Sequence, residues 1–561
     1  MLDVLVVGGG PVGLFFATLL KKSTPQCSVR VIDKEHDISE LSRAPGMHAR
    51  TLECISYLGS DLLSKFLEKG KQITGLDVFC DNKRILGIDI KDIRSPFNFV
   101  LSIPQNETET LMQEECKKLG VQVDRGVCLE QLKQEQDSVY VSLKHVQDNV
   151  TETVRARFLV GCDGGHSLVR KALGIEFIGT SRSEVFYMAD AKVEEFGSLN
   201  RSQLYFSERG PCFFIPLSKD MIRVVLEGSE DAQLGVSKYE DSHVNSETLE
   251  TFQRHLTEGF GTPLTLSNPT WITSFKVNQK MAAKYFVPNG CLLIGDAAHV
   301  HSPVGGQGMN MGMQDAFNLA WKMSLVLMNQ GNPRTLFESF EIERQQIARQ
   351  ILSSTGKATE LLLGHGFASR MIRSKFFTSS ISFLESWIPK RMIAERMSQI
   401  RLSYDPQLSP LFLSEPKSCL TRWKNRLSFN AFYEGQRAPC KGRIKSLDSG
   451  ETKTLLSMYS QSFAFLFLIL PANRNEALFL SQSLVPIKRF GCKTCIEIIW
   501  KNESQVKLEG SPHRQWIDMD NSFPPGPCRL IVVRPDGYIA SSGSESDTAR
   551  VIAFLDEWLS V

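Results

Sequence analysis

The start of the chain has the hydrophobic pattern of a strand, a glycine turn and a helix. Val4–Val7 is an uninterrupted apolar run, as expected for a strand that is buried on both faces. After a glycine-rich turn, the apolar stretch from Leu14 to Leu20 predicts a helix, and Val29–Ile32 predicts a second buried strand. Such a strand–helix–strand unit is typical of a parallel α/β sheet.

After this unit, the pattern changes several times between helical and strand-like spacing. Helices are expected in the first 120 residues and again after the middle of the chain, with a region of mostly strands between them. The expected helices are 50–58, 105–119, 313–328 and segments within 335–400, and the expected strands are 73–99, 121–123, 139–141, 158–161, several between 185 and 273, and 291–294.

The C-terminal part of the chain differs from the rest and follows a linker expected at Pro406–Pro416. An apolar strand is expected at Phe463–Leu470, followed by a strand pair at Cys495–Trp500 and Leu530–Val533. A turn at Pro535–Gly537 then precedes a terminal helix. We expect this part to form a separate domain.

Length and composition indicate a globular protein of several domains. The 561 residues exceed one ordinary domain, and 42% hydrophobic residues suffice for sizeable cores. The net charge of +2 gives no overall attraction to nucleic acid, so no such partner is expected. The most apolar late run, Phe463–Leu470, is too short to span a bilayer, so no membrane span is expected.

Cysteine usage and the position of the first strand bear on the compartment. The thirteen cysteines show no disulfide-like pattern. The first core strand begins at about residue 3, which leaves no room for a signal peptide. We therefore expect a cytoplasmic protein, and the sequence leaves a monomer and a homodimer both open.

A dinucleotide-binding fingerprint occupies the first turn. Gly8, Gly10 and Gly13 stand in G-x-G-x-x-G spacing, with Pro11 where the helix should start. Glycine lets the backbone approach a pyrophosphate at the positively polarised end of the helix. Asp33 closes the next strand about 20 residues later, where an acceptor for ribose hydroxyls belongs. A lone motif could be a packing turn between strand and helix, but Asp33 argues against that interpretation.

Two later motifs extend this signal. They are Cys162-Asp163-Gly164 and Gly295-Asp296-Ala297-Ala298-His299. Taken singly, the first would be an ordinary turn and the second an ordinary helix cap. In this order after the first fingerprint, the three motifs indicate bound FAD. No third ligand cluster accompanies His299 and His301, so no metal is expected.

Together with other segments, these motifs resemble class A FAD-dependent aromatic hydroxylases of the phenol hydroxylase and polyketide hydroxylase group. The resemblance covers nearly the whole chain, including the C-terminal thioredoxin-like domain of that group. The further segments that carry it are Arg43–Gly46, Ala49–Glu53, Pro104–Gln105, Pro303–Asn310, Gly435–Pro439 and Val533–Gly537.

The resemblance implies an α/β fold in three parts. A Rossmann-type FAD-binding domain is expected over 1–345, interleaved with a β-sheet substrate domain from about 76–100 and 185–273. A helical segment and linker should follow over 346–425, and a thioredoxin-like domain over 430–561.

The resemblance also implies roles for residues around the cofactor. Arg43 is expected at the FAD diphosphate, where a planar guanidinium can bind two oxygens. Gln105 would lie near the ribityl chain and the flavin, and Asp296 would accept a hydrogen bond from a ribityl hydroxyl. Asp163 with Arg170 belongs to a motif that serves both FAD and the nicotinamide cofactor in this group.

The segment before the long helix completes the implied site. Pro303 matches the residue that lines the space between flavin and substrate, so its expected catalytic part is to position them. Gly306, Gly308, Met309 and Asn310 should open a helix whose N–H groups face the pyrimidine edge of the flavin. There the helix end would stabilise negative charge on the reduced cofactor.

By the same resemblance, we expect the protein to be an FAD-dependent monooxygenase. NADPH or NADH would reduce FAD, and O2 would then give a flavin C4a-hydroperoxide that hydroxylates an aromatic ring. One alternative is an FAD-dependent dehydrogenase or oxidase on the same fold, without oxygen insertion. Another is a binding module that has lost its flavin, against which the intact motifs argue.

Several residues bear on the substrate and on the C-terminal domain. Some phenol hydroxylases carry an acidic residue where this chain has Pro45, so a simple phenol and a larger phenolic, quinone or polyketide-like compound both stay open. Cys492 and Cys495 form a C-x-x-C that precedes a later strand, so we expect it to be structural. The aromatic residues expected either to face the ring or to form the sheet core are Tyr205, Phe206, Phe213 and Phe214, with Pro216 beside them.

Overall fold

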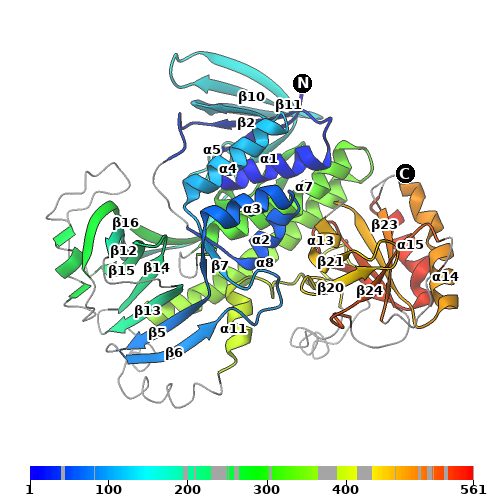
Figure 1. Ribbon diagram of the computed structural model, residues 1–561. Coiled ribbons are helices and arrows are strands. Elements are labelled where there is room, and N and C mark those ends of the chain that lie inside the picture. The colour runs from blue at the N-terminus through cyan, green and yellow to red at the C-terminus, as the bar shows by residue number, and fades with distance from the viewer. Residues whose placement is uncertain are drawn as a thin grey trace.

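The computed structural model contains three large β-sheets and one small sheet, with helices packed between and around them (Figure 1). The part of the chain that the structure describes consists of residues 1–39, 45–80, 83–193, 200–207, 210–228, 249–250, 252–254, 256–257, 265–301, 306–363, 388–413, 433–460, 463–490, 494–501, 508, 511–523 and 529–559.

The first sheet is built around the strand that opens the chain. β1 (Leu2–Val7) is parallel to β11 (Thr151–Gly161) on one side and to β2 (Val29–Asp33) on the other. Val4–Val7 is buried, as its uninterrupted apolar run predicts. The order is β17-β18-β11-β1-β2-β8, with β10 and then β9 attached at β11, and the other bounds are β8 Gln122–Arg125, β9 Val127–Glu135, β10 Ser138–His145, β17 Phe286–Val287 and β18 Cys291–Leu293.

Helices cover one face of this sheet (Figure 1). α1 (Pro11–Ser23) packs against α4 (Gln105–Lys118) and α7 (Gly308–Leu327). α7 begins at Gly308, whereas the hydrophobic pattern predicts a start at Met313. Glycine and asparagine have low helix propensity, so packing against α1 rather than propensity forms this first turn. The neighbouring helices are α2 (Ala49–Ser56), α3 (Ser60–Lys69) and α5 (Leu168–Ala172).

The second sheet takes its strands from separate parts of the chain. β13 (Arg201–Ser207) pairs in parallel with β5 (Gly75–Cys80), although more than a hundred residues separate them. The long strands β12 (Phe177–Val193) and β16 (Leu266–Ala282) pair antiparallel. The order is β19-β16-β12-β15-β14-β13-β5-β6, and the other bounds are β6 Lys83–Asp89, β14 Gly210–Pro216, β15 Met221–Gly228 and β19 His299–Val300.

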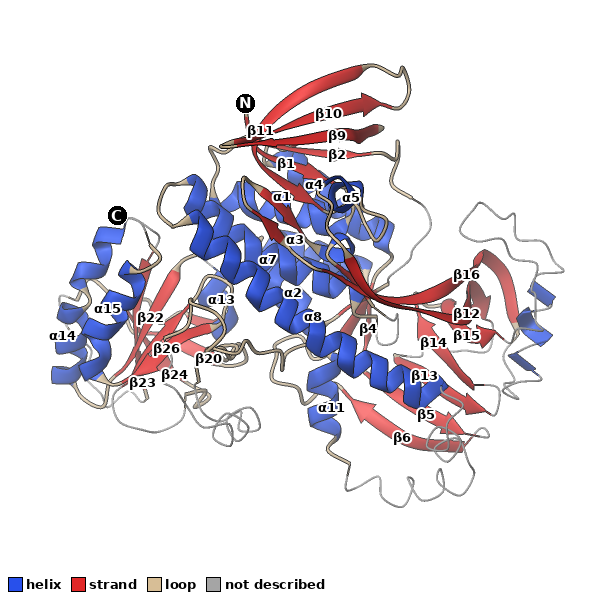
Figure 2. Cartoon of the chain, turned by 180° about the vertical axis from the view of Figure 1, so that it is seen from behind, coloured by secondary structure: helices blue, strands red, loops and turns tan. Residues whose placement is uncertain are grey.

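A long helix joins the first unit to the second sheet. α8 (Pro333–Leu363) starts beside α7 and reaches the strands β14 and β16 (Figure 2). α11 (Lys390–Met397) lies against β6. Among the described residues, no helix is long and apolar enough to cross a membrane. The small sheet has the order β3-β7-β4, with bounds β3 Gly46–Met47, β4 Lys71–Ile73 and β7 Val100–Ser102.

The third sheet forms the C-terminal domain. β22 (Phe465–Leu470) lies between β23 (Thr494–Trp500), which is parallel, and β25 (Arg529–Val533), which is antiparallel. The two strands expected as a pair therefore both flank β22, because the crossover through α14 (Arg474–Ser483) places β23 on its other side. The thioredoxin-like assignment stays a prediction. The order is β21-β20-β24-β23-β22-β25-β26, and the other bounds are β20 Arg443–Ser446, β21 Thr452–Thr454, β24 Arg514–Asp518, β26 Ile539–Gly543, α13 Leu455–Ser460 and α15 Thr548–Asp556.

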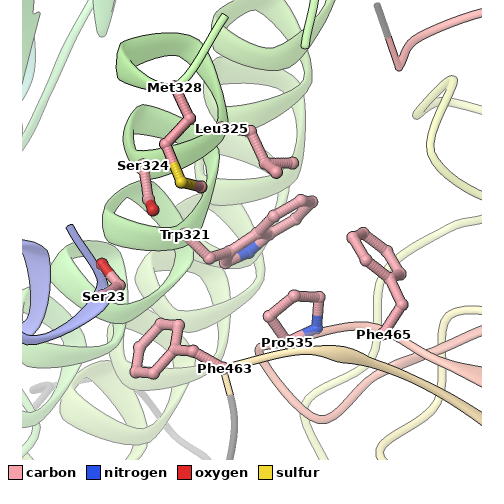
Figure 3. A pocket seen from close by; sticks show the side chains of 8 residues that line it. All are labelled: Ser23, Trp321, Ser324, Leu325, Met328, Phe463, Phe465 and Pro535. Atoms are coloured by element: carbon pink, nitrogen blue, oxygen red, sulfur yellow. The ribbon is translucent and has the colours of Figure 1, made fainter. Parts of the chain in front are cut away.

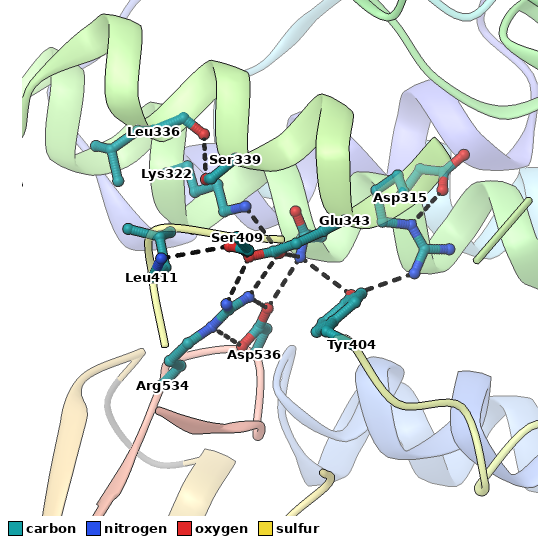
Figure 4. Close-up of polar contacts among 12 residues, drawn as sticks. Asp315, Lys322, Leu336, Ser339, Glu343, Tyr404, Ser409, Leu411, Arg534 and Asp536 are labelled. Carbon is teal, nitrogen blue, oxygen red and sulfur yellow. Dashed lines mark hydrogen bonds and ion pairs between the residues drawn. The ribbon is translucent and has the colours of Figure 1, made fainter. Parts of the chain in front are cut away.

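Buried charges join the C-terminal domain to α7 and α8 (Figure 4). Arg534 donates to both carboxylate oxygens of Glu343, at 2.7 and 2.9 Å, and Lys322 Nζ lies 2.9 Å from the same carboxylate. Burial alone would raise the pKa of Glu343, but Arg534 and Lys322 hold it well below its usual range. Burial also lowers the pKa of Lys322 to about 8, although Glu343 favours its charged form. Each of these charges has a partner, as burial requires.

Apolar side chains surround these charges on the same interface. Trp321 of α7 lies edge-on to Phe465 of β22, with ring centroids 5.7 Å apart. A small cavity here is lined mostly by apolar side chains from both sides, including Phe463 and Pro535 (Figure 3). The interface therefore combines a non-directional apolar contact with directional ion pairs.

Glu343→Gln is expected to destabilise the protein strongly. It leaves Arg534 and Lys322 buried without the carboxylate that they share, and removing one partner of a buried pair costs about 3–5 kcal/mol. Lys322→Met is the matched control, because Glu343 keeps Arg534, Asn318 and Ser409 as donors. Denaturant unfolding measures the two losses in unfolding free energy. Equal losses would contradict the central place of Glu343.

Glu343 should also make the protein sensitive to acid. Its pKa is below the ordinary value of 4.5 in the folded state, so its stabilising contribution is complete above about pH 4.5 and is lost as the pH falls. Consequently, the difference in unfolding free energy between the wild type and Glu343→Gln should shrink below that pH. A difference that is constant down to pH 3 would show that folding does not lower the pKa of Glu343.

Candidate functional site

The first and second sequence motifs are in direct contact. Gly8 has φ +113°, and a Cβ at this position would lie 2.4 Å from the carbonyl oxygen of Cys162. A Cβ at Gly13 would lie 2.0 Å from the carbonyl oxygen of Gly8. Because backbone atoms cannot move aside, only glycine fits at either position. The close approach places Cys162–Gly164 at the same edge of the first sheet as the glycine turn.

The N-terminus of α1 opens toward this edge. Gly10 is its N-cap and offers no side-chain hydrogen bond, and Pro11 follows as the first helical residue. A Cβ at Gly10 would meet no protein atom within 4 Å. The space beside Gly10 at this helix end is therefore open, and the dipole of the helix favours an anion there. This end of the helix fits a phosphate group.

Asp33 lies beside the same turn, at the end of β2. Its carboxylate accepts hydrogen bonds from the N–H of Gly9 at 2.6 Å and from the N–H of Glu35 at 2.9 Å. These bonds hold the half-buried carboxylate where a ribose acceptor is expected. Arg125, its register partner on β8, donates to the carbonyl of Gly9 at 3.3 Å. Arg125 was not predicted from the sequence, because only strand register brings it to this turn.

Asp163 and Arg170 hold the second motif in place. The carboxylate of Asp163 accepts hydrogen bonds from Leu168 N at 2.6 Å and Val169 N at 3.1 Å, which caps the start of α5. Arg170 donates to the carbonyl of Ala297 at 3.0 Å and lies over the ring of Phe177 at 3.8 Å. Arg170 thereby connects the second motif to the third. Their contacts with FAD and the nicotinamide cofactor stay predictions.

The third motif turns around a buried carboxylate. Gly295 N donates to Asp315 Oδ2 at 3.0 Å, and His299 Nε2 lies 2.7 Å from the same oxygen. Asp296 lies between these two anchored residues and is exposed beside the N-terminus of α7. Burial would raise the pKa of Asp315, but His299 and Arg344 hold it below its usual range. Asp315 was also missed in the sequence, where nothing but its place in an apolar helix marks it.

The N-terminus of α7 lies beside Asp296. A Cβ at Gly308 would be 4.0 Å from Asp296 Oδ1, and one at Gly306, with φ +61°, would meet no atom within 4 Å. Met309 is buried in the first turn. Gln307, the N-cap, makes no side-chain capping bond. In the part of the chain that the structure describes, this second helix end is therefore open, and it lies at the same edge of the sheet.

Asn310 fixes this helix end to another predicted segment. Its Oδ1 accepts hydrogen bonds from His48 N at 2.8 Å and Thr51 Oγ1 at 2.7 Å. Its Nδ2 donates to Gly46 O at 2.7 Å and Gly306 O at 2.9 Å. Four contacts use the whole amide. The side chain of Asn310 therefore positions the helix, and a cofactor contact by Asn310 would come from its backbone N–H.

Gln105 lies at the start of α4, close to the same segment. Its Nε2 donates to Glu109 Oε1 at 2.8 Å. The preceding strand pairs with Gly46–Met47, and Ile103 N donates to Pro45 O at 2.6 Å. Two predicted site residues, Arg43 and Pro303, lie outside the described residues.

The aromatic residues of the second sheet pack within its apolar clusters. Tyr205 stacks on Phe79, with ring centroids 4.7 Å apart, and meets Phe214 edge-on at 5.2 Å. Phe206 and Phe213 pack in the cluster around Val78 and Leu204. Phe214 is buried and belongs to the sheet core, whereas Tyr205, Phe206 and Phe213 are only partly buried, so for these three both interpretations stay predictions. Among the described residues, no group of three or more His, Cys, Asp or Glu could hold a metal ion.

Comparison with known proteins identifies the family. The family described as FAD binding domain matches residues 1–355. Rifampicin monooxygenase from Streptomyces venezuelae is 35% identical over 366 residues, which are 64% of this chain and 72% of that protein. The 6-methylpretetramide 4-monooxygenase of Streptomyces rimosus is 29% identical over 562 residues, 99% of this chain and 93% of that protein.

Solved structures agree with this result along the whole chain. OxyS anhydrotetracycline hydroxylase from Streptomyces rimosus is similar over 99% of this chain and 98% of its own, with a TM-score of 0.72 and 25% identity. Aklavinone-11 hydroxylase, solved with FAD and aklavinone, has the same fold, with a TM-score of 0.73, 18% identity and the same shares covered. The chain therefore belongs to the FAD binding domain family, as an FAD-dependent monooxygenase of the aromatic hydroxylase group.

Proposed function

We propose that the protein binds FAD between the N-termini of α1 and α7 and hydroxylates a multi-ring phenolic compound with NADPH or NADH and O2. One observation carries the proposal: the three motifs meet at one sheet edge, around two helix ends whose N-cap residues, Gly10 and Gln307, make no side-chain capping bond. FAD carries negative charge on its diphosphate and, once reduced, on its ring. The positive N-terminal ends of two helices can stabilise these two negative charges.

In this proposal, the adenosine half of FAD lies at the first turn. Gly8, Gly10 and Gly13, with Pro11 starting the helix, let the diphosphate reach the N–H groups of α1. Asp33 binds the adenosine ribose, since Gly9 N already orients its carboxylate. Arg43, outside the described residues, is proposed at the diphosphate.

The flavin half lies at α7 in the same proposal. Asp296 accepts a hydrogen bond from the ribityl chain, and Gln105 lies close to it. The N–H groups that follow Gly306 and Gly308, including those of Met309 and Asn310, face the flavin ring. Bound FAD supplies the reduction and oxygen chemistry, and these residues bind and orient it. Asp163 with Arg170 serves the nicotinamide side, and Pro303 positions the substrate.

Residue 45 and the relatives favour a large substrate. Pro45 is buried, stands where some phenol hydroxylases have an acidic residue, and binds Ile103 through its carbonyl. Two of the relatives that match along the whole chain are named for 6-methylpretetramide and anhydrotetracycline. Pentachlorophenol 4-monooxygenase, named for a single-ring phenol, is 32% identical over 65% of this chain. A single-ring phenol is therefore the alternative substrate in the labelling experiment below.

The compartment and the domain limits complete the proposal. The described cysteines are all free thiols, which supports a reducing compartment such as the cytoplasm. We keep the proposed division into an FAD-binding part with its interleaved sheet, a helical linker and a C-terminal domain.

Gly10→Ala is expected to weaken FAD binding without harming the fold. A methyl group at Gly10 meets no protein atom within 4 Å, and it would stand in front of α1, where the diphosphate is proposed. The dissociation constant for FAD should rise at least about tenfold, which is about 1.4 kcal/mol. Flavin fluorescence titration and the melting temperature of the apoprotein measure the two effects.

Gly13→Ala is the matched control in the same motif. Its methyl group would lie 2.0 Å from Gly8 O, so the apoprotein itself should lose stability. If Gly10→Ala bound FAD as tightly as the wild type, the diphosphate would not lie in front of α1.

Oxygen labelling is expected to separate the monooxygenase from a dehydrogenase. With NADPH or NADH and heavy-isotope O2, a hydroxylated product should carry one labelled oxygen atom per turnover. Mass spectrometry of the product of a tetracyclic phenol, compared with that of pentachlorophenol, also tests the substrate class. Oxygen derived from water would favour the dehydrogenase alternative, and turnover of the single-ring phenol alone would contradict the multi-ring proposal.

A further inference from the structure

We propose that Asp315 is a positioning residue for the flavin, and that it links the flavin-facing turn to the C-terminal domain. The proposal rests on the proposed place of Asp296 at the flavin. It assigns to the C-terminal domain an effect on the cofactor, although that domain carries none of the three motifs.

Buried hydrogen bonds hold Asp315 from both sides of its carboxylate. Its Oδ2 receives hydrogen bonds from Gly295 N at 3.0 Å and His299 Nε2 at 2.7 Å, and its Oδ1 receives one from Arg344 Nε at 2.6 Å. All of these partners are buried. Asp296 is exposed between two residues that a single carboxylate anchors. Moving that carboxylate therefore moves Asp296.

A series of polar contacts leads from Arg344 to the C-terminal domain. Arg344 Nη1 donates to the hydroxyl of Tyr404 at 3.2 Å, and Asn318 Nδ2 lies 3.1 Å from the same hydroxyl. Asn318 Nδ2 also lies 3.1 Å from Asp536 Oδ2. Asp536 is in turn held by Arg534, whose Nε lies 3.0 Å from Asp536 Oδ1. Buried polar contacts thus run without a break from the turn at 295–299 to the turn at 534–537. Figure 4 shows the part of this path from Asp315 to Asp536.

Tight packing makes this path rigid. Tyr404 packs against Tyr538 at 4.4 Å between ring centroids, and its N–H donates to Gly435 O at 2.9 Å. A Cβ at Gly312, one helical turn before Asp315, would lie 2.9 Å from the Cα of Gly295. The turn and the helix are therefore in backbone contact, and small shifts of one are passed to the other because packed interiors yield little.

The experiment measures FAD binding and the bound flavin rather than turnover. Asp315→Asn should raise the dissociation constant for FAD about ten- to a hundredfold, as the loss of a charge-assisted hydrogen bond does. Tyr404→Phe breaks the path far from the proposed flavin site. It should raise the dissociation constant for FAD about three- to tenfold, and it should shift the visible spectrum of the bound flavin in the same direction as Asp315→Asn does. In the double variant, the dissociation constant for FAD should rise by less than the product of the two single fold-changes, because both substitutions act through Arg344.

Glu497→Gln is the matched control. Glu497 is a buried carboxylate in the C-terminal sheet that receives a hydrogen bond from Trp516 Nε1 at 2.8 Å, and the path does not include it. This variant should lower the melting temperature and leave FAD affinity and spectrum within twofold of the wild type. A purely structural role of the network would make Tyr404→Phe behave in the same way.

Two results would overturn the proposal. One is wild-type FAD affinity and spectrum in Tyr404→Phe, and the other is full multiplication of the two single effects in the double variant. If Asp315→Asn does not fold, Tyr404→Phe still decides between the outcomes. Wild-type FAD affinity is measured first, so a wild type without FAD contradicts the proposed function, whereas unchanged flavin in the variants contradicts only this inference.

Discussion

The site depends on a packing contact among α1, α7 and the turn at Gly295 that leaves no room for another carbon atom. A Cβ at Gly312 of α7 would lie 2.6 Å from Cγ2 of Val12 in α1 and 2.9 Å from the Cα of Gly295. This contact brings the N-termini of both helices to one edge of the first sheet. It also sets the distance between the two places where FAD is proposed to carry negative charge. A larger residue at this contact would separate the two halves of the site.

A second constraint is the burial of charge at the C-terminal domain. Each buried ion costs several kcal/mol in lost hydration, which its partners must offset. The bidentate pair of Arg534 with Glu343 fixes both distance and angle, whereas the contact of Trp321 with Phe465 has no direction of its own. The ion pairs therefore define one docked arrangement of the domain, and the apolar contacts supply area. In this arrangement, the turn at 534–537 belongs structurally to the first unit as well as to its own sheet.

Pattern and resemblance predicted different features of this structure. The apolar run at Val4–Val7 predicted a strand buried on both faces, and β1 is one. Hydrophobic spacing placed the start of α7 at Met313, while the resemblance of its glycine segment implied the earlier start that the structure has at Gly308. The strands at 495–500 and 530–533 were both expected, but their separation by β22 was not, because spacing in one strand carries no information on its neighbour.

By itself, the sequence determined the parallel-sheet unit, the order of the three motifs and the glycines that the first turn requires. These features are local: glycine at Gly8 and Gly13, an apolar run or an acid after a strand can be recognised from adjacent residues. Only the tertiary structure decided that Asp315 anchors the third motif, that Asn310 uses its whole amide within the protein, and that Arg534 meets Glu343. Apart from the bond of Asn310 to Gly306, the partners in these contacts lie from 16 to 264 residues apart. Contacts at such separations arise from strand register and helix packing, which no short stretch of sequence contains.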